Sequence, residues 1–206
     1  MATLSWINIA QRLQSIAQTG LTYAQDPYDR ERYEEIAGIA MSMFAGGQPE
    51  HIQLAAKLFA DETGYATPKV DVRAAIFRDG KILLVRERED GCWTLPGGWA
   101  DVGISPAESV EKEVREEAGL AVKARKLLAA WDRNKHPHPP HAFHIYKLVF
   151  DCEIISGAPA AGSETSEAAF FGENEIPPLS LTRILPEQIA RIFEHLRHPD
   201  WPTEFD

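Results

Sequence analysis

The sequence predicts an α+β protein in which a small all-α segment precedes a larger domain of mixed strands and helices. Over roughly the first sixty residues, apolar side chains recur three and four positions apart, as on the buried face of a helix. From Thr67-Pro68 onwards, apolar and polar residues alternate instead, as in half-buried strands. The later strands and helices do not alternate regularly, which argues against a doubly wound parallel sheet. We therefore divide the chain into residues 1–66 and 67–206.

Three helices are expected in the N-terminal segment. The first ends at Thr19-Gly20, and residues 20–29 form a loop whose last residue, Asp29, caps a second helix running to about Phe44. Pro49 opens the third helix. Three short helices bury little surface by themselves, so this segment must pack against something else.

The larger domain begins with a hairpin. Residues 70–76 alternate between apolar and polar, Asp79-Gly80 is a tight-turn dipeptide, and residues 81–85 continue as a second strand. Further strands are expected over 127–131, 143–152 and 168–171, and a last amphipathic helix over 186–196.

Composition narrows the classes of partner. The 31 acidic residues exceed the 21 basic ones, and the formal net charge of −10 argues against nucleic acid or an anionic membrane as partner. No apolar run approaches the roughly 20 residues that cross a bilayer, and no signal-peptide pattern is present, so we expect a soluble cytoplasmic protein. Cys92 and Cys152 are then two reduced thiols. A small anionic substrate is still compatible, because carboxylates that bind divalent cations make a site locally positive.

The best-defined local feature is a glycine-containing loop that leads into a helix. The loop contains Gly97 and Gly98, and the helix starts at a capping box in which Ser105 is followed three residues later by Glu108. Gly119 stands where a left-handed C-cap is needed. The sequence therefore predicts a helix over residues 106–118.

Three carboxylates stand on one face of this helix. Glu113, Glu116 and Glu117 have relative positions zero, three and four, so their side chains are neighbours. An acidic face of this kind can simply be solvated. Carboxylate oxygens are also the ligands that Mg²⁺ and Mn²⁺ prefer, and the glycines beside them leave room for backbone carbonyls to reach an ion.

The loop and helix resemble the signature of the Nudix hydrolase family. That signature is a Gly, five residues, a Glu, seven residues, then Arg-Glu, an apolar residue, any residue, Glu-Glu, any residue, Gly and an apolar residue. This chain has Gly98 and, at the matching spacing, Lys-Glu-Val-Arg-Glu-Glu-Ala-Gly-Leu over residues 112–120. The resemblance covers about residues 67–185 and implies an α/β/α sandwich with a mixed sheet.

The resemblance implies metal-dependent catalysis by named residues. Glu116 and Glu117 would bind Mg²⁺ or Mn²⁺, Glu113 would assist, and a backbone carbonyl of the glycine pair, assigned to Gly98, would add a ligand. The bound metal would neutralise phosphate oxygens and lower the pKa of a water molecule.

Two positions depart from the signature. Ile104 stands where the first Glu belongs, and Lys112 replaces the Arg. Ile104 cannot ligate a metal, and Lys112 keeps the charge without the planar fork of a guanidinium. A non-catalytic nucleotide-binding module with the same fold is therefore the alternative to an active enzyme.

The general base and the substrate contacts are sought in later loops. In the family the base often comes from such a loop, and Glu164 and Glu167 are the candidates; the alternative is that both are solvated loop residues. Arg133, Lys135 and His136 could reach a phosphate or a base, although an exposed loop without function fits them equally.

The N-terminal segment narrows the resemblance further. Trp6 and the segments 20–23 and 26–33 look like bacterial Nudix proteins with a helical N-terminal extension, a group that includes CDP-choline and ADP-ribose pyrophosphatases. The expected activity is hydrolysis of the pyrophosphate bond in such a nucleoside diphosphate conjugate. The extension forms either homodimer contacts or a cap on its own catalytic domain. RNA processing is a third possibility that the net charge disfavours.

Overall fold

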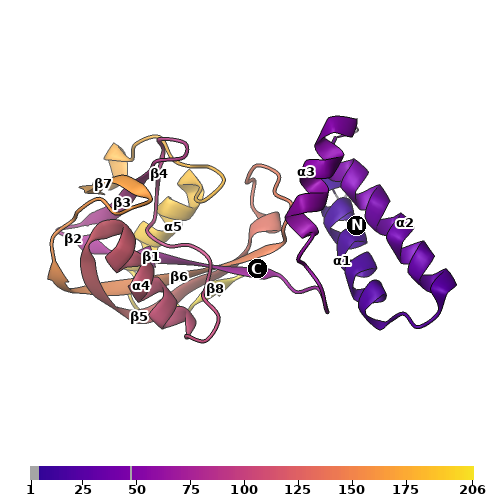
Figure 1. Ribbon diagram of the computed structural model, residues 1–206. Helices are drawn as coiled ribbons and strands as arrows, with labels where there is room; N and C mark the ends of the chain where they lie inside the picture. Colours follow the sequence, from indigo (N-terminus) through magenta and orange to yellow (C-terminus); the bar gives the residue numbers. More distant parts are fainter. Residues whose placement is uncertain (1–4, 47) are drawn as a thin grey trace. The chain divides into compact units, whose positions relative to one another are not determined.

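The computed structural model describes residues 5–46 and 48–206, and the chain separates into two compact units (Figure 1). One unit contains the described residues up to Pro68 together with Pro140–His144, and we call it the helical unit. The other contains Lys69–Pro139 and Ile145–Asp206, and we call it the catalytic unit for reasons given below. Each is described by itself.

The helical unit contains α1 (Trp6–Tyr23), α2 (Pro27–Phe44) and α3 (Pro49–Phe59). The expected end of α1 at Gly20 is wrong, because the helix continues to Tyr23. The reason is tertiary: a Cβ at Gly20 would lie 2.4 Å from ring atoms of Tyr33 in α2. Gly20 therefore permits two helices to approach closely rather than ending one of them.

The start of α2 also differs from the expectation. Its N-cap is Asp26, whose carboxylate accepts a hydrogen bond from the Tyr28 N–H at 2.7 Å, with Pro27 at the first helical position. Asp29, the expected cap, lies inside the first turn, where its negative charge interacts favourably with the positive N-terminal end of the helix dipole.

A mixed sheet forms the first half of the catalytic unit. Its strand order is β1 (Lys69–Ala75), β6 (Ile145–Gly157), β5 (Leu120–Asp132) and β8 (Glu204–Phe205). The β1–β6 and β5–β8 pairs are parallel, and the β5–β6 pair is antiparallel. Strand β5 extends beyond the expected range of 127–131 at both ends, and β6 begins two residues after the expected 143 and ends five residues after the expected 152.

The second sheet of this unit is antiparallel. It contains β2 (Phe77–Arg78), β3 (Lys81–Glu87) and β4 (Trp93–Thr94), and β7 (Thr165–Phe171) pairs with the other side of β3. The Asp79-Gly80 turn is confirmed, with φ of 52° and 74°. Two positive φ values match the right-handed twist of the flanking strands. The expected pairing of residues 70–76 with 81–85 is wrong, because β1 pairs with β6 and the turn joins β2 to β3.

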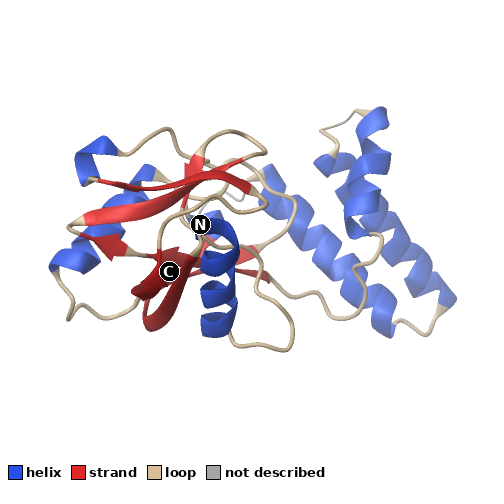
Figure 2. Cartoon of the chain, turned by 60° about the vertical axis from the view of Figure 1, so that its left-hand side comes forward, coloured by secondary structure: helices blue, strands red, loops and turns tan. Residues whose placement is uncertain are grey.

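Helices cover both faces of the strands in the catalytic unit (Figure 2). Along β3, Leu83 and Val85 belong to the apolar cluster that includes α4 (Pro106–Ala118). Ile82 and Leu84 belong to the opposite cluster, which includes α5 (Pro186–Arg197). The strand is buried on both faces. The α+β fold with a mixed sheet and preceding helices is thus confirmed. Short 3₁₀ turns occur at Arg133–Lys135 and Glu173–Glu175.

Candidate active site

Helix α4 begins and ends where the sequence predicts. The Ser105 hydroxyl accepts a hydrogen bond from the Glu108 N–H at 3.2 Å, and the Glu108 carboxylate accepts one from the Ser105 N–H at 2.8 Å. At the other end Gly119 has a left-handed conformation with φ of 68°. The helix is therefore specified by local chemistry at both ends.

The glycine pair packs directly on β1. The N–H groups of Val72 and Ala74 donate to the carbonyls of Gly98 and Pro96, at 2.8 and 2.9 Å. Gly97 has a φ of 138°, and a Cβ there would lie 2.0 Å from the Val72 carbonyl oxygen. Only glycine allows this approach.

Two of the three predicted carboxylates, those of Glu117 and Glu113, contact the Gly97-Gly98 pair. The Gly97 N–H donates to Glu117 Oε2 at 2.8 Å, and a Cβ on Gly98 would lie 3.4 Å from Glu113 Oε2. The Glu117 residue is only 7% exposed. Burial raises the pKa of the Glu117 carboxyl to about 7, and the nearby charge of Glu113 acts in the same direction. Burial also raises the pKa of Glu113, as does the neighbouring Glu116.

The third carboxylate is oriented differently. Glu116 is exposed, and its Oε2 lies 3.8 Å from Lys112 Nζ. The same ammonium donates to Asp101 Oδ2 at 2.7 Å. Lys112 therefore holds the loop before α4 against the acidic face of the helix. Ile104, the other departure from the signature, is 40% exposed and offers no polar atom.

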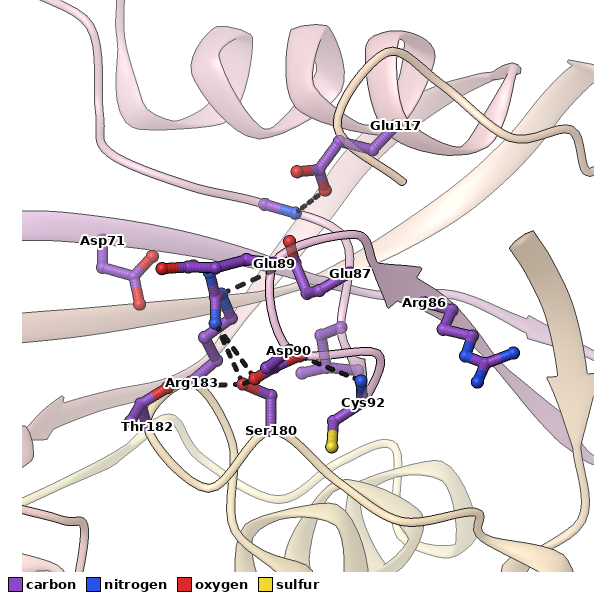
Figure 3. Close-up of polar contacts among 12 residues, drawn as sticks. Asp71, Arg86, Glu87, Glu89, Asp90, Cys92, Glu117, Ser180, Thr182 and Arg183 are labelled. Atoms are coloured by element: carbon purple, nitrogen blue, oxygen red, sulfur yellow. Dashed lines mark hydrogen bonds and ion pairs between the residues drawn. The ribbon is translucent and has the colours of Figure 1, made fainter. Parts of the chain in front are cut away.

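A fourth acidic residue, Glu87, completes the group and was not expected. It ends β3, is 7% exposed, and has its Oε1 3.4 Å from Arg183 Nε (Figure 3). Burial raises its pKa, and its charge contributes to the raised pKa of Glu117. A register shift between Arg86 and Glu87 interrupts the strand alternation at this point, so the sequence pattern does not identify Glu87.

Arg183 joins this carboxylate to the β3–β4 turn. Its guanidinium lies 2.5 Å from Glu89 Oε2 and 3.4 Å from Asp90 Oδ2, and it donates to Ser180 Oγ at 3.0 Å. Figure 3 shows these groups gathered around one guanidinium below Glu117. Nothing in the local sequence pattern identifies Arg183, because its partners lie far away along the chain.

The structure separates the two candidate bases. Glu164 is exposed, immediately precedes β7, and is one of the charges that raise the pKa of Glu87. Glu167 forms an ion pair with Arg86 at 2.8 Å. Arg86 and Glu167 are also directly paired residues of β3 and β7, so this ion pair holds Glu167 beside Arg86. The Arg88 N–H donates to the Glu164 carbonyl at 3.1 Å, so Glu164 lies beside the residue that follows Glu87, whereas Glu167 is paired with Arg86.

A buried ionic cluster lies beneath the loop. Arg73 donates to Asp71 Oδ1 at 3.0 Å and to the Leu95 carbonyl at 3.1 Å, and Lys147 Nζ donates to Asp71 Oδ2. Burial lowers the pKa of Lys147 to about 8, which the contact with Asp71 opposes. Burial alone would raise the pKa of Asp71, but Arg73 and Lys147 hold it below its usual value. The Arg73 charge also opposes the raised pKa of Glu117.

The predicted substrate-contacting residues do not converge. Arg133 is 3% exposed and donates to the Pro139 carbonyl at 2.7 Å, and burial lowers its pKa. This guanidinium is therefore bound to a backbone carbonyl inside the protein rather than exposed to a substrate. Lys135 is exposed, and His136 Nε2 lies 3.3 Å from Asp206 Oδ2. The sequence grouped these residues by proximity along the chain, whereas the turn points them in different directions.

The donor set fits a hard divalent cation. Glu113 and Glu117 present carboxylate oxygens at the glycine pair, where their mutual repulsion and burial disfavour ionisation and would be relieved by a positive ion. Within residues 5–46 and 48–206, no three His, Cys, Asp or Glu side chains are already gathered as a metal-binding group. The Gly98 carbonyl, expected as a ligand, accepts one hydrogen bond, from the Val72 N–H, and keeps a second lone pair.

Comparison with known proteins places the chain in a family. The model of the NUDIX domain matches residues 67–192, and a model described as a UDP-X-like, N-terminal oligomerisation domain matches residues 5–59. The chain therefore belongs to the Nudix hydrolase family, which favours an enzyme over the non-catalytic module.

Individual relatives extend the likeness over the whole chain. The chain is 47% identical to Bacillus subtilis YjhB, which carries ADP-ribose pyrophosphatase as a provisional name, over 98% of this chain and 97% of that protein. A crystal structure of an ADP-ribose pyrophosphatase from Streptococcus suis is 44% identical with a TM-score of 0.62, covering 68% of this chain and 100% of that one. A crystal structure of a UDP-X diphosphatase is 35% identical with a TM-score of 0.64, covering 98% of both chains. Among the described residues, no helix combines the length and apolarity that a membrane span requires.

Proposed function

We propose that this chain hydrolyses the pyrophosphate bond of a nucleoside diphosphate conjugate, with ADP-ribose as the first candidate substrate and Mg²⁺ or Mn²⁺ as the cofactor. One observation carries the proposal: Glu117 is buried against the Gly97 N–H while Glu113 lies on Gly98. A solvated acidic helix face would not bury one of its carboxylates against a glycine backbone.

Glu113, Glu116 and Glu117 would hold the metal. When bound, the metal would screen the phosphate charge and acidify a water molecule. Because Pro96 and Gly98 both direct their carbonyls at β1, the carbonyl of Gly97 is the better candidate for a backbone ligand. Lys112 would orient Glu116, from which it lies 3.8 Å.

Glu164 is the favoured general base. Glu164 and Glu87 interact electrostatically. Together they add two carboxylates to the three that α4 supplies. Glu87 would accept a proton or orient the Glu164 loop, and the Arg183 contact would keep its carboxylate in place. Arg73 would supply fixed positive charge beneath the phosphates.

The choice of ADP-ribose rests on relatives. The Streptococcus suis structure is described as an ADP-ribose pyrophosphatase, and Bacillus subtilis YjhB, which matches over nearly the full length of both chains, carries that name provisionally. CDP-choline and UDP-linked compounds are tested as well, since the resemblance of the N-terminal segment includes CDP-choline pyrophosphatases and a similar structure over the full chain is a UDP-X diphosphatase.

We further propose that the N-terminal segment, residues 1–66, makes a homo-oligomer. An apolar hollow of about 840 Å³ is lined by side chains of α1 and α2 that include Trp6, Ile39 and Met43. Trp6 is 49% and Ile39 is 48% exposed. Exposed apolar surface of this kind is typical of a contact site, and the matching family is described as an oligomerisation domain.

The test is a substrate panel. Purified protein with Mg²⁺ or Mn²⁺ is incubated with ADP-ribose, CDP-choline and UDP-glucose, and release of nucleoside monophosphate is measured. We expect ADP-ribose to give the highest kcat/KM. We expect Glu117→Gln to lower kcat by on the order of 10³, because the shape is kept and the charge that holds the metal is lost.

The control is Glu175→Gln, the same substitution at an exposed residue whose Oε2 lies 3.8 Å from Lys81 Nζ. This variant should keep wild-type activity. Wild-type protein that binds these compounds without releasing product, or a Glu117→Gln variant as active as Glu175→Gln, would contradict the proposal.

A further inference from the structure

The loop that joins β6 to β7 packs on the C-terminal end of α4. This end of a helix leaves its last four carbonyls without partners inside the helix. The Ala160 N–H donates to the Ala118 carbonyl at 3.0 Å, and the Thr165 hydroxyl donates to the Glu117 carbonyl at 2.7 Å. Residues 160–165 therefore supply, from outside the helix, donors that its last turn needs.

The close approach between this loop and α4 depends on a glycine. A Cβ on Gly162 would lie 2.0 Å from the Glu116 carbonyl oxygen, a separation that no side chain allows. The Gly162 N–H donates to the Thr165 hydroxyl oxygen at 2.8 Å, so this hydroxyl both accepts and donates. Thr165 is fully buried, and both of its partners are backbone groups. Its hydroxyl is therefore a fixed link between the loop and the helix that carries Glu117.

The same loop is also attached to the end of β3. The Arg88 N–H donates to the Glu164 carbonyl at 3.1 Å, and Arg88 Nε donates to the Ser163 carbonyl at 3.1 Å. Thr165, the first residue of β7, pairs with Glu87, the last residue of β3. The backbone of Glu164 is thus held between β3 and α4, whereas its side chain is exposed.

We propose that Thr165 is a positioning residue that sets the place of Glu164 relative to the carboxylates of α4. The inference rests on the proposed function, in which Glu164 is the general base and Glu117 helps to hold the metal. A general base works only within hydrogen-bond reach of the water molecule whose proton it accepts. Because the Thr165 hydroxyl binds the backbone of Glu117 itself, it fixes the backbone of the base relative to that of the metal-binding residue. In this role Thr165 acts through Glu164 rather than on the substrate.

Hydrogen exchange of the full chain tests the link without metal or substrate. Thr165→Val keeps the branched shape and removes the hydroxyl, so the Glu117 carbonyl and the Gly162 N–H both lose their hydrogen bond to it. We expect amide exchange over residues 158–164, followed by mass spectrometry, to become at least about 5-fold faster. Exchange over α5 should not change. Thr165→Ser keeps the hydroxyl and should exchange like the wild type.

Thr94→Val is the matched control. Thr94 is also fully buried, but its hydroxyl has no hydrogen-bond partner among the described residues. The same substitution there should leave the exchange of residues 158–164 unchanged. If the Thr165→Val protein does not fold, Gly162→Ala takes its place, because a methyl group there displaces the loop from the Glu116 carbonyl while the hydroxyl stays. It should give the same faster exchange.

Hydrolysis then shows whether the link acts through the base. With the panel substrate that the wild type hydrolyses best, Thr165→Val should lower kcat by at least about 10-fold, and Thr165→Ser should keep most of the wild-type value. In a Glu164→Gln background the same substitution should have no further effect, because the group that it positions has been removed. Unchanged exchange in Thr165→Val, or an equal loss of kcat in the Glu164→Gln background, would overturn the role of Thr165 alone. A wild type that hydrolyses none of the substrates would overturn the proposed function and this role together.

Discussion

The two units of this chain bury different kinds of side chain. In the helical unit, the fully buried apolar residues are the small ones, Ala10, Ala17 and Ala40. Larger apolar residues of that unit are left in the open, with Leu54 62% and Leu58 50% exposed. In the catalytic unit the fully buried set includes large aliphatic residues. These are Ile76, Ile82, Leu83, Leu84, Leu95, Leu120, Ile184 and Ile192.

This contrast shows where each unit obtains its stability. Two helix-bounded clusters give the catalytic unit a core of its own, on which the rigid positions of Glu117 and Gly97 depend. The helical unit has a smaller cluster, in which Phe44 and Phe59 pack against Met41 and small residues. Its exposed large side chains, such as Leu54 and Leu58, gain little until a partner covers them. The same kind of residue thus stabilises the fold in one unit and is available for association in the other.

The largest expected effect is on the core of the catalytic unit. Leu84→Ala removes a fully buried side chain from the cluster on the α5 side and leaves a cavity. We expect a loss of about 3 kcal/mol of unfolding free energy and a fall of about 10 °C in Tm, measured by chemical and thermal denaturation. Leu54→Ala, the same truncation at an exposed position of the helical unit, should change the stability of the isolated chain by less than about 0.5 kcal/mol. Similar losses of unfolding free energy in both variants would contradict the difference in core packing between the two units.

The second prediction concerns association through the helical unit. Ile39→Glu places a charge in the apolar hollow between α1 and α2. If this surface is an interface, the variant should lose at least about 2 kcal/mol of association free energy, about 30-fold in Kd, and its mass by light scattering should fall to that of a single chain. Gln53→Glu adds the same charge at an exposed polar site and should keep the wild-type mass. A wild-type chain that is monomeric throughout would remove the basis for the oligomer.

Local signals predicted α4 and its carboxylates because capping chemistry lies within the helix itself. Ser105, Glu108 and Gly119 specify the ends without help from the rest of the chain. The misread Gly20 shows the opposite case, since its reason is the ring of Tyr33 in another helix. Strand β5 was underestimated because register shifts near residues 121, 124 and 127 interrupt its alternation.

The active-site residues divide in the same way. Glu113 and Glu117 share one helix face, so their spacing in the sequence predicted their proximity. Glu87, Arg183 and Glu164 come from three other segments and meet only in the folded chain. Arg133 was misjudged because a basic residue in a polar loop looks available, whereas the Pro139 carbonyl binds its guanidinium inside the protein.

The smallest predicted effect is an acid sensitivity within the catalytic unit. His138 Nδ1 lies 2.7 Å from the Leu181 carbonyl, and burial lowers the pKa of the ring to about 4. The unfolded chain, with an ordinary value near 6.5, binds more protons than the folded chain between these two limits. Stability should therefore fall as the pH drops from about 6.5 towards 4.

His138→Asn keeps a hydrogen-bond donor for the Leu181 carbonyl and removes the titratable ring. Denaturation at pH 7 and pH 5 should show about 1 kcal/mol less acid destabilisation in the variant, after allowance for solvent screening of the partly exposed ring. Equal pH dependence in both proteins would mean that the ring is protonated in the folded state, and that the catalytic unit does not bury this group as described.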